Sequence, residues 1–89
     1  HATCLRFIRE ADCALLVWDM MHETHGSSTD GANVHMAVTY YGLPLVDNAL
    51  LEPLAKACAE EGRYEFLLTV NPLVVHGGTG SPVNPVAAF

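Results

Sequence analysis

Cys13-Ala14-Leu15-Leu16-Val17-Trp18 is an unbroken apolar run of strand length, and it ends at the carboxylate of Asp19. A strand with one solvated face alternates apolar and polar side chains, whereas a strand covered on both faces is continuously apolar. The run therefore predicts a strand in a central or parallel position. Ligands of open α/β sheets bind beyond the carboxyl ends of such strands, which is where Asp19 stands.

Two segments have the apolar spacing of amphipathic helices. One covers residues 2–11, and the other ends at Glu61, directly before a glycine that suits a helix C-terminus. Asp47 is the expected N-cap of the second helix. Pro53 leaves two alternatives, because it either lies in the first turn of a helix that begins near Leu51 or kinks a longer helix.

Strands are expected at residues 34–41 and 64–70, followed by a short extended piece at 73–75 and an irregular tail. The resulting order predicts an α+β or α/β fold in a single domain, residues 1–89. Its architecture is a two-layer sandwich of two helices on a small three- to four-stranded sheet, either ferredoxin-like or a piece of a doubly wound sheet. The inward faces predict a core that consists of Leu15, Val17, Leu54, Cys58, Leu67 and Val70.

The apolar content is high for a chain of 89 residues. Apolar residues make up 51% of the chain, and the mean hydropathy is +0.23. A small domain buries little of its surface, so such a surplus is typical of a subunit interface. Residues 31–46 and 66–89 contain no Lys, Arg, Asp or Glu. We therefore expect a homo-oligomer or a larger assembly with another chain, with Val86-Ala87-Ala88-Phe89 docked on a partner surface.

The charge balance excludes two classes of partner. Four basic residues stand against ten acidic ones, which gives a net charge of −6. Nucleic acids and anionic membranes are bound by clustered Lys and Arg, so neither is an expected partner. The longest apolar stretch, residues 66–75, is too short to span a membrane. Cys4, Cys13 and Cys58 lie among Leu and Ala, and they are expected to be reduced and buried in a cytoplasmic protein.

Chemistry-bearing side chains are densest between residues 19 and 35, where three histidines and three carboxylates occur. Asp19 lies between Trp18 and Met20, which would desolvate it partly, as suits a general base. The candidate catalytic residues are Asp19, His22 and Glu23, and the candidate ligands of Zn²⁺ or non-haem Fe²⁺ are His22, His25 and His35. The alternative is that Asp19 caps a turn and the histidines belong to a solvated loop.

A glycine-rich segment, residues 76–81, follows a predicted strand. Glycines allow several backbone amides to converge on an anion. A Walker loop is excluded, because the segment has no Lys and Pro82 prevents a following helix. The candidate anion-binding residues are Gly77, Gly78, Thr79 and Gly80, and the alternative is an ordinary turn.

Two functions remain open from the sequence. The first is a small-molecule enzyme subunit that uses the His/carboxylate cluster at a strand end, with or without a divalent metal, for hydrolase- or lyase-like chemistry on a small polar substrate. The second is a non-catalytic structural or binding subunit of an oligomeric assembly. Metal content of protein purified without a His tag distinguishes them.

Overall fold

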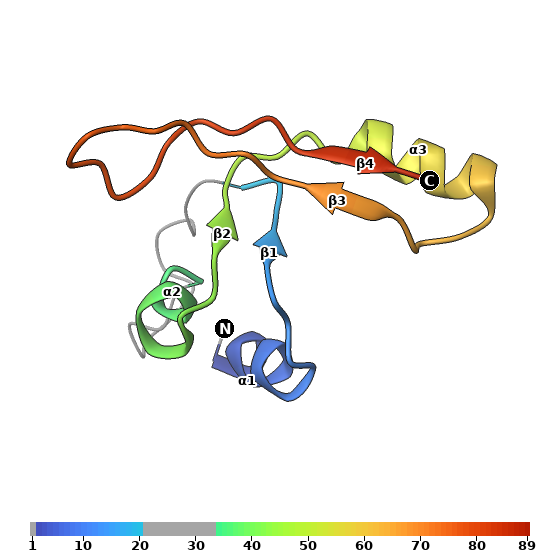
Figure 1. Cartoon of the computed structure of the whole chain (residues 1–89). Coiled ribbons are helices and arrows are strands. Elements are labelled where there is room, and N and C mark those ends of the chain that lie inside the picture. The colour runs from blue at the N-terminus through green and yellow to red at the C-terminus, as the bar shows by residue number, and fades with distance from the viewer. Residues whose placement is uncertain (1, 21–33) are drawn as a thin grey trace. The chain divides into compact units, whose positions relative to one another are not determined.

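The computed structural model describes residues 2–20 and 34–89 (Figure 1). In these residues the chain is mixed α/β, and its strands form two separate two-stranded sheets. It divides into two compact units, unit 1 (His1–Leu50) and unit 2 (Leu51–Phe89). None of the helices in these ranges is long and apolar enough to cross a membrane. The elements are α1 (Ala2–Glu10), β1 (Leu16–Val17), α2 (Met36–Tyr41), β2 (Leu45–Val46), α3 (Glu52–Glu61), β3 (Leu67–Thr69) and β4 (Val86–Ala88).

Unit 1 is built around a parallel pair of strands, β1 and β2. Leu16 pairs with Leu45, and Val17 pairs with Val46. The Trp18 N–H donates to the Val46 carbonyl at 3.1 Å, which continues the pairing beyond β1. Parallel strands need a crossover connection, and this one contains α2 (Figure 1). The parallel position predicted for the apolar run is therefore confirmed for Leu16 and Val17, whereas Cys13 and Ala14 lie outside the strand and are exposed.

The core of unit 1 lies between α1, α2 and the segment that enters β2. Ile8, Ala37 and Leu43 form one buried cluster, and Ala37 is completely inaccessible to solvent. Leu5 and Leu16 pack against this cluster. The helix predicted for residues 2–11 is confirmed, one residue shorter, with Ile8 on its buried face.

Residues 34–41 do not form the expected strand, because α2 occupies most of this segment. Val, Thr and Tyr favour strands, and this propensity suggested a strand. Val34, in the turn directly before α2, and Ala37, in its first turn, are nevertheless three residues apart, and both are buried. The helix ends at Gly42, whose φ of 66° is the left-handed conformation that glycine adopts easily. Burial of one helical face therefore outweighs local strand propensity here.

In unit 2, α3 begins after Leu51 and has Pro53 in its first turn. Proline is well tolerated there, because the first N–H groups of a helix have no intrahelical acceptor. The helix ends at Gly62, with a φ of 66°, and the Arg63 N–H donates to the Cys58 carbonyl at 3.2 Å. Of the two sequence alternatives, the helix that starts near Leu51 is confirmed.

The other part of unit 2 is the antiparallel pair of β3 and β4 (Figure 1). The rings of Phe66 and Phe89 are 5.3 Å apart, and the Arg63 guanidinium lies 5.6 Å from the Phe89 centroid. The tail therefore pairs with its own chain, and the extended piece expected at 73–75 is not the partner strand. The register joins Leu67 to Ala88, Leu68 to Ala87 and Thr69 to Val86.

The predicted core is only partly correct. Cys58 is buried, but the Leu67 side chain is 69% exposed, because a two-stranded sheet leaves part of its surface uncovered. Cys4 and Cys13 are exposed rather than buried, and all three cysteines are free thiols. The other predicted core residues have intermediate exposure: Leu15, Val17, Leu54 and Val70.

Candidate functional site

The carboxyl ends of β1 and β2 lie side by side in unit 1. Val17 is paired with Val46, so the residues that follow them, Trp18 and Asp47, are neighbours across the pair. The Ala49 N–H donates to the Trp18 carbonyl at 2.9 Å and keeps the chain beyond β2 next to the end of β1. This edge of a parallel pair is where α/β proteins place their ligands.

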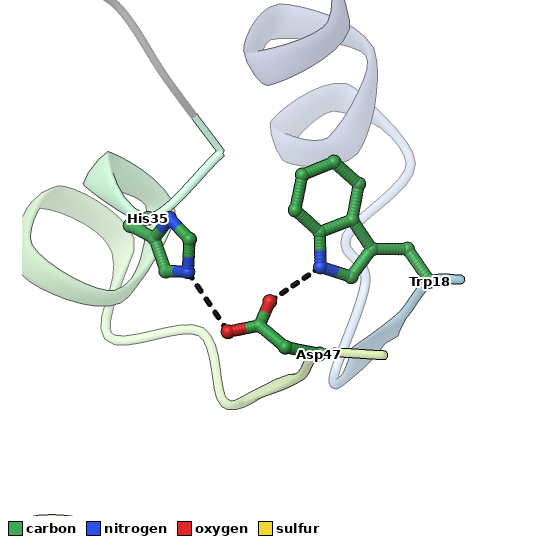
Figure 2. Close-up of polar contacts among 3 residues, drawn as sticks. All are labelled: Trp18, His35 and Asp47. Atoms are coloured by element: carbon green, nitrogen blue, oxygen red, sulfur yellow. Dashed lines mark hydrogen bonds and ion pairs between the residues drawn. The ribbon is translucent and has the colours of Figure 1, made fainter. Parts of the chain in front are cut away.

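Both oxygens of the Asp47 carboxylate are engaged at this edge (Figure 2). The Trp18 Nε1–H donates to Oδ1, and His35 Nε2 lies 2.9 Å from Oδ2. His35 is the residue directly before α2. The Trp18 and His35 rings are oriented edge to face, with centroids 6.3 Å apart and an interplanar angle of 74°. Three separate segments thus contribute one side chain each to a single cluster.

The electrostatics of the cluster favour an ionised carboxylate. Burial raises the pKa of Asp47, but the hydrogen bonds from Trp18 and His35 and the charge of protonated His35 lower it, so that the net pKa lies below the ordinary value. The His35 and Asp47 side chains are 39% and 34% exposed, so solvent reaches the pair. Asp47 is therefore an anion at neutral pH, in contact with solvent and with two ring nitrogens.

An ionised carboxylate selects the tautomer of the imidazole beside it. Carboxylate oxygens only accept hydrogen bonds, so the His35 nitrogen that faces Asp47, Nε2, carries the proton. In neutral His35 the other nitrogen, Nδ1, is then an unprotonated acceptor. An imidazole held in this way by a carboxylate is suited to accept a proton from a bound molecule or from water.

Of the predicted site residues that the structure describes, His35 lies in this cluster. Asp19 is exposed just beyond the end of β1 and takes no part in the cluster. His22, Glu23 and His25 lie outside the described residues, so their catalytic and metal-binding roles stay predictions. Within residues 2–20 and 34–89, no group of three or more His, Cys, Asp and Glu side chains is placed to hold a metal ion.

Sequence reasoning missed Trp18 and Asp47. Asp47 was expected to cap the second helix, but Leu51 stands at the N-cap of α3 and no side chain caps it. A usable signal was present, because residues 43–46 repeat the pattern of an apolar run that ends at a carboxylate. Two such runs joined by a crossover predict a parallel pair. Alignment of the two carboxylates would place Asp47 beside Asp19, whereas the observed register differs by one residue and places Asp47 beside Trp18.

The glycine-rich segment of unit 2 forms a turn. The Gly78 N–H donates to the Val75 carbonyl at 3.0 Å, and Gly77 has a φ of 72°. The Leu73 N–H donates to Ser81 Oγ at 2.9 Å across the base of the loop. These contacts account for two of the glycines as turn residues and occupy one of the amides. Anion binding stays a prediction for Gly77, Gly78, Thr79 and Gly80.

Comparisons of this chain with protein-family models, with curated proteins and with solved structures find no match. The candidate site is defined by its position at the strand ends, by the 2.9 Å contact between His35 and Asp47, and by the hydrogen bond from Trp18.

Proposed function

We propose that unit 1 is a catalytic unit for a small polar molecule, with His35 as its general base and Asp47 as the residue that orients the imidazole. The observation that carries this proposal is the 2.9 Å contact between His35 Nε2 and Asp47 Oδ2 at the carboxyl ends of two parallel strands. It leaves Nδ1 as the proton acceptor. Hydrolase- and lyase-like reactions both need this step, because each begins by removing a proton from water or from the substrate.

Trp18 and Asp47 act as positioning residues in this proposal. The indole N–H holds one carboxylate oxygen, so the other oxygen is presented to the imidazole in a fixed direction (Figure 2). An imidazole with a fixed orientation needs less reorganisation to reach the geometry of proton transfer. Asp19, at the same strand end, remains a candidate for a second proton transfer.

We further propose that unit 1 corresponds to a piece of a doubly wound sheet. Two features support this over a ferredoxin-like sandwich: α1 directly precedes β1, and the crossover to the parallel strand β2 contains a helix. In doubly wound sheets the loops after the strands form the ligand site. The fold proposal and the site proposal therefore point to the same edge of the sheet.

The test is hydrolysis of p-nitrophenyl acetate, a small ester, in a background that carries Cys4→Ser and Cys13→Ser, because the exposed thiols of these residues also cleave it. We expect His35→Gln to remove most of the turnover, by a factor of about 100 or more. His76→Gln is the matched control, because His76 is an exposed histidine of unit 2. Asp47→Ala is expected to lower turnover with the far-UV circular dichroism unchanged. Equal losses in His35→Gln and His76→Gln would contradict the proposal.

A second function, a non-catalytic subunit of an oligomeric assembly, is favoured by the surface of unit 2. Leu67 and Leu73 are 69% and 62% exposed, and residues 66–89 carry no charged side chain. Exposed apolar side chains on an uncharged segment are typical of association surfaces. Sedimentation equilibrium at micromolar concentration tests this function: a stable oligomer is expected, and a monomer over the whole concentration range would contradict it.

A further inference from the structure

Unit 1 has a hollow at the end of the strand pair opposite to Trp18, His35 and Asp47. Its volume is about 180 Å³. Residues 13–14, which precede β1, and residues 42–44, which precede β2, form part of its wall. The rest is formed by Ile8 and Arg9 at the end of α1, by Asp12 directly after it, and by Tyr41 at the end of α2. The cavity therefore lies at the amino ends of the strands and is separate from the proposed catalytic site.

The wall of the cavity combines an apolar floor with two opposite charges. Ile8 and Leu43 line the cavity and are buried, with 8% and 5% exposure. Arg9 and Asp12 also line it, but their side chains are 68% and 96% exposed, which places the charges at the rim. Arg9 Nη1 and Asp12 Oδ1 are 3.9 Å apart. Charge-assisted hydrogen bonds are shorter than this, so both groups keep donor and acceptor capacity for a ligand.

Asp12 ends α1 in the left-handed conformation, which Asp adopts more readily than most other non-glycine residues. Asp12 has a φ of 52°, and the Cys13 N–H donates to the Ile8 carbonyl at 3.3 Å, as in a left-handed helix ending. The equivalent position at the end of α3 is Gly62. Glycine adopts this conformation without steric strain, so an aspartate at residue 12 places a charge on the rim where glycine suits the backbone better.

We propose that this cavity binds a small apolar α-amino acid. The carboxylate of the ligand pairs with Arg9, its ammonium group pairs with Asp12, and its side chain lies against Ile8 and Leu43. A ligand with only a carboxylate meets the negative charge of Asp12, and a ligand with only an amine meets the positive charge of Arg9. A hollow of about 180 Å³ that is open to solvent accommodates a branched aliphatic side chain without enclosing it.

The expected affinity is modest because both charges are solvated. Exposed ion pairs contribute little each, so we expect a dissociation constant of about 1 mM and a two- to fivefold loss, roughly, when either charge is removed. This proposal does not rest on the proposed function of the His35–Asp47 pair, and each of the two proposals can be contradicted without affecting the other.

The experiment is a titration of the ¹⁵N-labelled full chain with L-leucine, followed by amide chemical shifts. We expect saturable shifts at Ala14 and Leu43. Two analogues each lack one charge: 3-methylbutylamine has no carboxylate, and 4-methylpentanoate has no ammonium group. Both are expected to bind several-fold more weakly than leucine. Absence of saturable shifts with leucine, or equal affinity for leucine and either analogue, would overturn the proposal.

Variants test the two rim charges in the same titration. Arg9→Gln and Asp12→Gly are expected to weaken leucine binding, and Asp12→Gly keeps a residue that suits the left-handed backbone, so it folds. Arg6→Gln is the matched control, because Arg6 is an exposed arginine of the same helix that does not line the cavity. Unchanged leucine affinity in Arg9→Gln, or an equal loss in Arg6→Gln, would also overturn the proposal.

Discussion

Replacing Asp47 by alanine removes the acceptor that joins three segments of unit 1. The Trp18 N–H and His35 Nε2 both lose their partner on the carboxylate. Hydrogen bonds to a charged acceptor contribute about 1.5–3 kcal/mol when buried, and exposed ion pairs contribute about 0–1 kcal/mol. The His35 and Asp47 side chains are 39% and 34% exposed. We therefore expect Asp47→Ala to lower the free energy of unfolding by about 1–2 kcal/mol in total.

The assay is urea unfolding followed by tryptophan fluorescence. Trp18 is the sole tryptophan, so its emission reports on unit 1. For a unit of this size the free energy falls by about 1 kcal/mol per molar urea, so the midpoint is expected to drop by about 1–2 M. Asp47→Asn separates hydrogen bonding from charge, because the amide retains one acceptor oxygen. Its urea midpoint should lie between those of Asp47→Ala and the wild type. A shift below about 0.3 M for Asp47→Ala would refute the contribution assigned to these contacts.

The wild type and Asp47→Asn are also expected to differ in how their free energy of unfolding depends on pH. The pKa of Asp47 is lowered in the folded chain. Its contribution to stability is therefore present above the unfolded pKa of about 3.9 and is lost as the pH falls through the lower folded pKa. Wild type should lose stability more steeply below about pH 4 than Asp47→Asn, which cannot titrate there. Parallel acid curves for the two proteins would show that Asp47 is not stabilised as an anion.

Three further predictions concern packing and backbone. Ala37 is fully buried, so Ala37→Val should overpack the core of unit 1 and cost about 1–3 kcal/mol in the same urea assay; an unchanged midpoint would show spare space there. Gly62 has a φ of 66°, so Gly62→Ala should destabilise α3 by about 1–2 kcal/mol, measured by thermal circular dichroism, and unchanged melting would contradict the helix ending. Deleting residues 86–89 removes β4, so the β3 amides should lose protection in hydrogen exchange; retained protection would mean that β4 is not their partner.

The sequence predicted those elements of the chain that depend on local pattern. The spacing in residues 2–11 indicated α1, and the positions of Pro53 and Gly62 indicated both ends of α3. The continuous apolar run indicated β1 and its parallel position. In each case the residues that determine the structure lie within a few positions of one another, so periodicity and end signals were sufficient.

Local pattern failed where partners distant in sequence determine the outcome. Residues 34–41 have strand propensity, but the buried face of α2 depends on Ile8 of another helix. Residues 73–75 and 86–88 are both short and apolar, and only the second pairs with β3. Propensity does not distinguish two such segments, because pairing depends on the turn between them and on register.

The candidate site also depends on contacts between segments that are distant in sequence, which is why local pattern did not predict it. The contact between Trp18 and Asp47 spans 29 residues and exists only because β1 and β2 pair in one register. A shift of one residue would place a neighbour of Asp47 beside Trp18 and leave His35 without its carboxylate. The hydrogen bond from Trp18 thus stabilises the register and also orients the proposed base. Removing Asp47 should therefore lower stability and activity together, whereas His35→Gln removes the base and leaves the contact between the strands in place.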